Sequence, residues 1–466
     1  MAPTAPSAPR APTAPDRTGA HPSPFTLGVP ASVTLIIESI RKVKVMIFVH
    51  QRGRSRTAGP RALAVASTCL IALSACGSGG SGGSSSAGSG GTLTLNETDY
   101  YGSAPQNTQI QGVLTECADQ VGGVKVVHHE LPREQLMPKL LQQASSKSLP
   151  DLLLVDNPDL QQMASTGGLV SLSAGGLSTD GLYPSIVSAG TYQGQVYGIA
   201  PGVNGLALYY NKDMFTAAGL TPPATWDDLT ADAQKLTAGG KQGIAFSAVG
   251  TEEGSFQFEP FFWTAGADLK TLNSPQAVQA LTLWKTFVDK GWASKSVVSW
   301  TQADVEQQFA AGNVAMMVNG PWQLPGLNAT AGLHFGTVPI PVPSPTAKPV
   351  TPLGGEVWAV GHSNAAREAK AVAVVKCLLS ADKAAEWSKD AGYIPSNEAA
   401  AAQLGASDPQ LQAFVTEIAT AKARTAVLGT DYPKVSTALF TALQAALAGG
   451  TSPQDALNQA QSQAGS

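Results

Sequence analysis

The side chains most able to do chemistry in this sequence are aromatic rings that stand beside carboxylates and amides. They lie at or just beyond the ends of three predicted strands: Asp99, Tyr100 and Tyr101 at the first, Glu130 at the second, and Asp156 and Asn157 at the third. In a mainly parallel sheet, ligands bind outside the carboxyl ends of the strands. Rings stack on apolar C–H faces, and planar polar groups form paired hydrogen bonds with hydroxyls. These residues therefore predict noncovalent binding of a hydroxyl-rich molecule.

The elements that must position these residues alternate between strand and helix. Strands are predicted at residues 92–101, 124–131 and 151–156, and helices at residues 107–120 and 138–148. This order is typical of an α/β layer with a mainly parallel sheet. The sequence therefore predicts that the candidate residues share one edge of that sheet.

A second α/β unit is expected after residue 211. The chain has 466 residues, and a single core stops growing at about 250 to 300 residues. Ser274 and Pro275 predict the start of a helix in this unit, and Gly291 predicts its end. The proline-rich residues 338–350 are too rich in proline for a helix or a central strand, so we interpret them as a connector between lobes.

Charge is unevenly distributed along the chain. There are 29 Lys and Arg residues against 33 Asp and Glu residues, for a net charge of −4. The first 75 residues are basic, so the remainder is acidic. Nucleic-acid binding depends on clustered basic residues, and an acidic body argues against it.

Residues 46–76 have the pattern of a bacterial lipoprotein signal peptide. A stretch with four arginines precedes the apolar run 62–73, which is too short for a mature membrane span. Leu73-Ser74-Ala75-Cys76 then matches the lipobox, in which the cysteine receives the lipid. The pattern predicts lipidation of Cys76 and a location on the outer face of the cell membrane. The alternative is a buried apolar helix with an incidental cysteine.

The segments around the predicted signal peptide have no capacity to form a core. Residues 77–91 contain only Gly, Ser and Ala, which is typical of a flexible tether. Residues 1–45 precede a complete signal peptide, so we expect translation to start at Met46 and residues 1–75 to be absent from the mature protein.

The remaining cysteines and histidines do not predict a metal site or a cofactor. Cysteines occupy positions 69, 76, 117 and 377, without the spacing of a zinc site. His128 and His129 are neighbours on a strand, so their side chains point to opposite faces. With Cys76 lipidated, Cys117 and Cys377 remain in an oxidising compartment. They either form a disulfide or are two separate buried thiols.

Five motifs give the chain a family resemblance. They are LPDLLLVD (149–156), YGIA with YYNKDMFTAAGL and TWDDL (197–229), FAAGNVAMMVNGPW (309–322), LGGEVWAV (353–360) and GYIPS (392–396). In this order they resemble the extracellular solute-binding proteins, family 1, of ABC importers, and in particular the sugar-binding group that includes maltose-binding protein. The resemblance covers residues 92–466.

The resemblance implies an α/β, two-lobe periplasmic-binding-protein fold of type II. Each lobe would be a mainly parallel sheet flanked by helices. Lobe 1 would comprise residues 92–203 and 351–403, and lobe 2 residues 204–350 and 404–466. The resemblance also implies a monomer whose lobes close on a neutral sugar or oligosaccharide. The protein would deliver this ligand to the transmembrane subunits of an ABC permease and would not be an enzyme.

The resemblance and the strand ends together nominate the ligand-binding residues. Trp322 ends the Asn-Gly-Pro-Trp motif, at a position where the family stacks an aromatic ring on sugar. The other candidates are Tyr100, Tyr101, Asp156, Asn157, Asn204, Glu253, Phe256, Gln257, Glu259, Gly355, Glu356 and Tyr432. Relatives often place charged residues or Trp after the first and third strands, so the particular sugar is not specified. Few basic residues occur at these positions, which argues against a phosphate or carboxylate ligand.

Other functions are compatible with some of these residues. The carboxylates Asp156, Glu252, Glu253 and Glu259 would be the candidates for a glycoside hydrolase, which needs two carboxyl groups across the scissile bond. The same fold could instead bind a polyol or, through the pairs Tyr100-Tyr101 and Tyr209-Tyr210, a ferric ion. Product formation or an iron-dependent colour would distinguish these alternatives from sugar binding.

Overall fold

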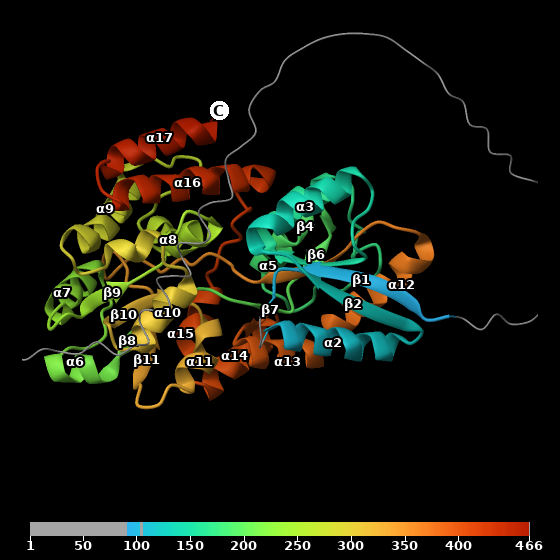
Figure 1. Cartoon of the computed structure of the whole chain (residues 1–466), viewed down its shortest axis with the longest axis horizontal. Helices are drawn as coiled ribbons and strands as arrows, with labels where there is room; N and C mark the ends of the chain where they lie inside the picture. The colour runs from blue at the N-terminus through green and yellow to red at the C-terminus, as the bar shows by residue number, and fades with distance from the viewer. Residues whose placement is uncertain (1–90, 103–105, 466) are drawn as a thin grey trace, which may run out of the picture. The chain divides into compact units, whose positions relative to one another are not determined.

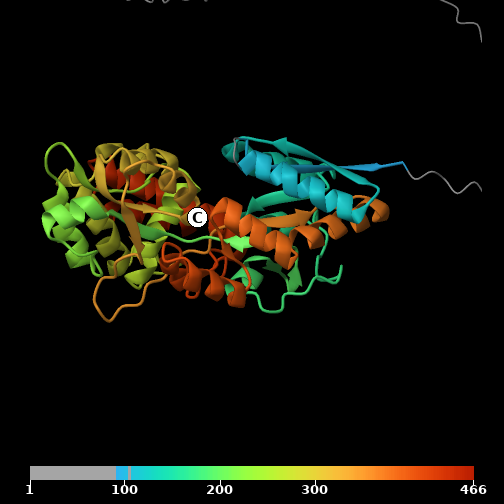
Figure 2. The ribbon, with the colours of Figure 1, turned by 90° about the horizontal axis from the view of Figure 1, so that it is seen from below.

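The computed structural model describes residues 91–102 and 106–465. The predicted signal peptide, Cys76 and nearly all of the tether lie outside the described residues. Within the described residues, no helix is both long enough and apolar enough to cross a membrane. The described residues form two lobes, each built on one sheet (Figures 1 and 2).

The first sheet has five strands in the order β2-β1-β3-β12-β6. Its strands are β1 (Leu93–Asp99), β2 (Val124–Glu130), β3 (Leu152–Asp156), β6 (Gly198–Ile199) and β12 (Glu356–Val360). Every residue of β3 is buried. Leu152 and Leu154 join one hydrophobic cluster, and Leu153 and Val155 join another. Alternation along the strand therefore supplies a core on both faces of this sheet.

Helices cover the two faces of the first sheet. Helices α2 (Gln106–Val121) and α12 (Ala365–Leu378) pack on one face, together with α13 (Ala381–Ala391). Helices α3 (Arg133–Ser145) and α4 (Leu160–Ser165) pack on the other. Cys117 of α2 and Cys377 of α12 form a disulfide with an Sγ–Sγ distance of 2.05 Å. The bond joins two helices of the same face.

The second sheet has four strands in the order β11-β8-β10-β9. They are β8 (Ala207–Asn211), β9 (Gln242–Ala245), β10 (Val314–Asn319) and β11 (Phe335–Val338). The helices of this lobe are α6 (Lys212–Ala218), α7 (Trp226–Leu236), α8 (Glu252–Thr264), α9 (Pro275–Asp289), α10 (Gln302–Ala310), α11 (Leu324–Asn328), α16 (Tyr432–Leu447) and α17 (Pro453–Gly465). Ser274 caps α9 by accepting a hydrogen bond from the backbone of Ala277, and Gly291 follows the helix with φ of 72°. Both predicted ends of this helix are confirmed.

The α/β class is confirmed, but the sheets are mixed rather than mainly parallel. Strand β1 is parallel to β2 and β3, whereas β12 is antiparallel to both of its neighbours. In the second sheet β8 is antiparallel to β10 and β11. Strands β8 and β12 are the first long strands after the chain passes from one sheet to the other. Each enters its sheet from the side of the neighbouring lobe and therefore runs antiparallel to the strands beside it.

Three segments run side by side where the chain passes between the lobes. The backbones of Asn204 and Gly354 exchange two hydrogen bonds of 3.2 and 2.8 Å. Lys422 donates to Thr351 and accepts from Leu353. The short strands β7 (Gly202–Val203) and β13 (Ile394–Pro395) pair antiparallel beside them. The remaining short elements are β4 (Thr191–Tyr192), β5 (Gln195–Val196), α5 (Pro184–Ala189), α14 (Glu398–Ser407) and α15 (Gln412–Ile418).

Candidate ligand-binding site

A cavity of about 150 Å³ is lined by residues from both lobes. The first lobe contributes the ends of β1 and β3, the start of β12 and the end of α13. The second lobe contributes the first turns of α8 and the turn after β10. The segments between the lobes contribute Asn204, Gly354 and Gly355. The cavity therefore lies where the two lobes meet.

Aromatic rings form much of the cavity wall. The centroids of Tyr100 and Tyr101 are 4.7 Å apart at the end of β1. Trp322 lies in the turn after β10. Its ring centroid is 6.4 Å from that of Phe256 and 6.5 Å from that of Tyr393. Trp322 is only partly buried, so part of its ring remains accessible. Rings from both lobes can thus contact the apolar faces of a ligand.

Glu356 lies among the tyrosines at the start of β12. Its Oε1 accepts a hydrogen bond of 2.5 Å from the Tyr100 hydroxyl, and its Oε2 accepts one of 3.1 Å from Tyr393. Burial, together with the charge of Asp156, raises the pKa of Glu356 above its usual value, although the Tyr100 hydrogen bond opposes this shift. Burial also raises the pKa of both Tyr100 and Tyr101 well above the usual value. These phenols therefore remain protonated and donate hydrogen bonds.

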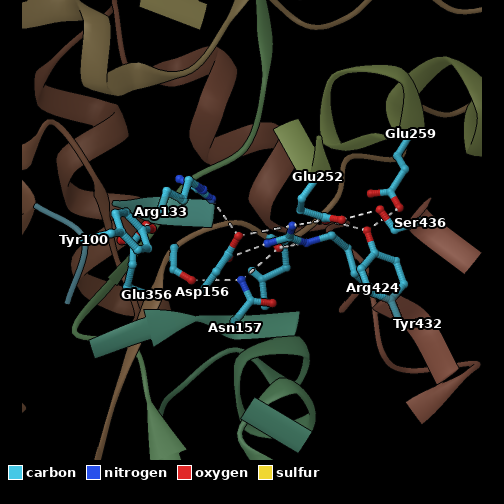
Figure 3. Close-up of polar contacts among 12 residues, drawn as sticks. Tyr100, Arg133, Asp156, Asn157, Glu252, Glu259, Glu356, Arg424, Tyr432 and Ser436 are labelled. Carbon is cyan, nitrogen blue, oxygen red and sulfur yellow. Dashed lines mark hydrogen bonds and ion pairs between the residues drawn. The ribbon is translucent and has the colours of Figure 1, made fainter. Parts of the chain in front are cut away.

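A network of ion pairs forms the other side of the cavity (Figure 3). Arg424 donates to Asp156 Oδ1 at 2.7 Å and to Glu252 Oε1 at 2.6 Å, and its side chain is 2% exposed. Arg133 Nη2 contacts Asp156 Oδ2 at 3.0 Å, with the arginine half exposed. Tyr432 donates to Glu252 Oε1 at 2.7 Å. Asp156 from one lobe and Glu252 from the other are thus joined through a single buried guanidinium.

Close backbone approach at the lobe junction depends on glycine. Gly355 has φ of 109°, in the region that favours glycine. A Cβ at Gly354 would lie 1.9 Å from Asn204 Oδ1. Any side chain at Gly354 would displace the Asn204 amide from the cavity wall. Asn157 holds the same turn, because its Nδ2 donates to the carbonyl oxygens of Leu353 at 3.1 Å and Gly355 at 2.9 Å.

The structure brings nine of the thirteen predicted ligand residues to the cavity. They are Tyr100, Tyr101, Asp156, Asn204, Glu253, Phe256, Trp322, Gly355 and Glu356. The predicted positions Asn157, Gln257, Glu259 and Tyr432 are buried outside the lining. Gln257 and Glu259 of α8 face away from the cavity: Gln257 accepts a hydrogen bond from the Ser247 backbone N–H, and Glu259 accepts one from the Tyr432 hydroxyl. Glu130 also lies elsewhere, accepting a hydrogen bond from Asn107.

Residues that the sequence did not nominate also line the cavity. Those with polar or aromatic side chains are Gln106, Arg133, Gln302, Trp387, Tyr393 and Arg424. Arg133 begins the helix that follows β2, so the strand-end argument could have found it. Tyr393 lies within the GYIPS motif. Arg424 has no local signal. The two arginines correct the expectation that basic residues would be nearly absent, but the carboxylates of Asp156, Glu252, Glu253 and Glu356 outnumber them.

Comparison with known proteins identifies the family. The model of the bacterial extracellular solute-binding protein family matches residues 113–413, and the chain belongs to this family. A binding protein of Brucella abortus (strain 2308) is 28% identical over 290 residues, which are 60% of this chain and 70% of that protein.

Solved structures share the fold over most of the chain. The cyclic alpha-maltosyl-1,6-maltose binding protein of Arthrobacter globiformis has 27% sequence identity and a TM-score of 0.68, with 80% of this chain and 98% of that chain covered. An ABC transporter solute-binding protein of Thermotoga lettingae TMO, bound with alpha-D-tagatose, has 25% identity and a TM-score of 0.71, with coverages of 80% and 98%.

Proposed function

We propose that this member of the bacterial extracellular solute-binding family captures a neutral sugar or oligosaccharide and delivers it to an ABC permease. The single observation that carries the proposal is a cavity between two lobes in which aromatic rings face hydrogen-bonding carboxylates and amides. Sugars present apolar C–H faces and a rim of hydroxyls, and this wall matches both. The two solved relatives above that bind a sugar and a cyclic oligosaccharide support the same ligand class.

The charges of the cavity favour an uncharged ligand. Arg424 is occupied by Asp156 and Glu252, and Arg133 pairs with Asp156. An anionic ligand would have to displace one of these carboxylates and would meet the charges of the others. Arg133, being half exposed, is the residue through which a sugar phosphate would bind if the charge argument failed.

The same contacts disfavour the two other functions considered from sequence. Asp156 and Glu252 are both held by Arg424, so neither is poised as the acid or nucleophile of a glycosidase. A ferric site of the tyrosinate type needs phenol oxygens that are free to bind the ion, whereas the Tyr100 hydroxyl donates to Glu356 and the Tyr101 hydroxyl lies 3.3 Å from that of Tyr393. Tyr209 of the second pair is fully buried and donates to the Gly320 carbonyl oxygen.

Ligand binding would close the lobes about the three adjacent segments near Asn204, Thr351 and Lys422. We place two lobe boundaries at residues 203/204 and 350/351, as the sequence predicts. For the third we propose the segment near Lys422, because the predicted position 403/404 falls inside α14 (Glu398–Ser407). The closed form would be the one that the permease recognises, and a lipid on Cys76 would keep a monomer at the membrane surface.

A ligand screen on the purified protein tests this function. A ligand that binds only the folded state raises apparent stability by RT ln(1 + [L]/Kd). We expect thermal shifts with one or more neutral mono- or oligosaccharides, unchanged sugar after prolonged incubation, and no shift with sugar phosphates. A shift confined to sugar phosphates would contradict the charge argument, and released product would show hydrolysis.

Trp322→Ala tests the aromatic wall. If this ring stacks on the sugar, its removal should weaken calorimetric affinity by about 2 kcal/mol, while the unfolding free energy without ligand changes little. Trp292→Ala is the matched control, because Trp292 is also a partly buried tryptophan of the second lobe but does not line the cavity. Equal affinity of the Trp322 variant and the unsubstituted protein would remove this ring from the site.

A further inference from the structure

Three potential metal ligands meet on adjacent strands of the first sheet, outside the cavity lining. Parallel pairing of β1 with β2 places Glu97 opposite His128 and Asp99 opposite Glu130. Alternation puts Glu97 and Asp99 on the same face of β1 as Leu95, which packs in the cluster that includes Ile110 and Leu114 of α2. The side chains therefore point into the layer between the sheet and α2.

The carboxylate of Glu97 is buried without a hydrogen-bonding partner. Its side chain is 0% exposed, and neither of its oxygens has a hydrogen-bond partner among the described residues. Asp99 Oδ2 and His128 Nε2 are likewise buried without a hydrogen bond. An isolated buried carboxylate is strongly unfavourable unless a cation or a proton compensates it. The described residues offer this group no Lys or Arg ion pair, and only His128 lies within reach.

The two distances from the imidazole to the carboxylates are close to those around a small tetrahedral ion. His128 Nε2 lies 3.0 Å from Asp99 Oδ1 and 3.6 Å from Glu97 Oε2, and one ligand atom from each residue lies within 4.8 Å of the others. Zinc bonds to N and O ligands of about 2.0 to 2.2 Å require neighbouring ligand atoms about 3.3 to 3.5 Å apart in a tetrahedron. An imidazole with two carboxylates also disfavours Mg²⁺ and Ca²⁺, which prefer oxygen ligands alone.

We propose that Glu97, Asp99 and His128 bind one Zn²⁺ ion between β1, β2 and α2. Three protein ligands leave the fourth tetrahedral position for a water molecule. Two carboxylates and a neutral imidazole carry a charge of −2, which the ion balances. The sequence did not predict this site, because the three residues do not form a known metal-binding motif. Glu97 and Asp99 come from β1, and the pairing register of the strands brings His128 of β2 beside them.

The ion would support the sugar cavity without touching the sugar. Asp99 Oδ1 accepts a hydrogen bond of 2.8 Å from the backbone N–H of Tyr101, and Tyr100 and Tyr101 line the cavity. A metal that fixes the Asp99 carboxylate therefore fixes the turn that presents both tyrosines. This consequence depends on the proposed function, whereas zinc binding does not.

Metal analysis of the full chain, purified without a histidine tag, tests the site directly. After chelator treatment and equilibrium dialysis against Zn²⁺, we expect one zinc per chain and a raised thermal midpoint. Glu97→Gln and His128→Gln should each lower zinc affinity at least tenfold. His129→Gln is the matched control, because this neighbour on β2 faces the other way, where its Nε2 lies 3.2 Å from Asn96 Oδ1, and should retain full binding.

Cobalt spectroscopy keeps the test valid if a variant fails to fold. Co²⁺ added to the unsubstituted protein should give the intense visible absorption of a tetrahedral site, and Zn²⁺ should abolish it. Absence of both zinc uptake and this absorption would overturn the proposal, as would equal loss of zinc in His129→Gln. Zinc binding without sugar binding would retain the metal site and reject only its link to the cavity.

Discussion

Two groups of buried carboxylates in the first lobe are compensated in different ways. At the end of β3, Asp156 pairs with Arg424 at 2.7 Å and with Arg133 at 3.0 Å. On β1, Glu97 and Asp99 have only His128 nearby, and both oxygens of Glu97 lack a hydrogen bond among the described residues. The first group is paired with two arginines, whereas the second has only a histidine beside it and, as proposed above, takes its cation from solution. Burial alone therefore does not show what a carboxylate does.

Glu417 shows a third way to compensate a buried carboxylate. It is fully buried on α15, and its Oε1 accepts a hydrogen bond of 2.7 Å from the backbone N–H of Ile340. Burial raises its pKa to about 8. Near neutral pH this side chain is largely protonated. A proton therefore neutralises Glu417, whereas Arg424 neutralises Asp156. The three groups can be distinguished by experiments that remove each compensating partner.

Arg424→Met should produce the largest loss of stability. The substitution leaves Asp156 and Glu252 buried without their shared guanidinium, and removal of one partner from a buried ion pair typically costs about 3 to 5 kcal/mol. Urea unfolding without ligand measures this change. A loss below about 1 kcal/mol would mean that water or rearrangement compensates both carboxylates, and the contrast with Glu97 would fail.

Glu417→Gln should remove a pH dependence rather than lower stability at every pH. A carboxyl group whose folded pKa is raised stabilises the fold below its unfolded pKa, and that stabilisation is lost as pH rises through the folded pKa. Between pH 5 and pH 8 the loss should be about 3 kcal/mol, given 1.36 kcal/mol per pKa unit. Urea unfolding of both proteins at these pH values measures it. An unchanged pH slope in Glu417→Gln would assign the dependence to other groups.

Much of this architecture could be predicted because its signals are local. The cap at Ser274 and the glycine at position 291 predicted α9, and the apolar run 152–155 predicted the strand that the structure shows as β3. Trp322 was found through a turn motif, and Tyr100, Tyr101 and Asp156 through the ends of strands. Each of these signals lies within a few residues of the feature that it specifies.

The features that sequence reasoning missed depend on contacts between distant residues. Arg424 meets Asp156 across 268 positions of the chain, and no motif marks it. His128 meets Glu97 only through the register of β1 and β2. Glu259 and Tyr432 were nominated for the ligand, but they contact each other behind Glu252 instead. Helical position alone did not show where the cavity ends along α8.

Arg133→Met should have the smallest effect on stability, although Arg133 contacts the same carboxylate as Arg424. Its side chain is 50% exposed, against 2% for Arg424. Exposed ion pairs contribute roughly 0 to 1 kcal/mol, because water competes for both charges. Its guanidinium also lies 4.5 Å from the centroid of the Tyr100 ring, which adds about 0.5 to 1 kcal/mol at an exposed site. We therefore expect a loss of about 1 kcal/mol in urea unfolding.

The two arginine variants together show whether the stabilising effect of an arginine on Asp156 depends on the burial of the pair or only on the contact itself. Each should be combined with Asp156→Asn, so that a double-mutant cycle gives the coupling of each arginine to this carboxylate. We expect strong coupling for Arg424 and weak coupling for Arg133, and we expect only the Arg133 coupling to fall clearly in high salt, since exposed pairs are screened. Equal couplings would show that Asp156 is solvated in the absence of ligand. The carboxylate would then be compensated by water, and its contact with Arg424 would serve to join the lobes rather than to neutralise a buried charge.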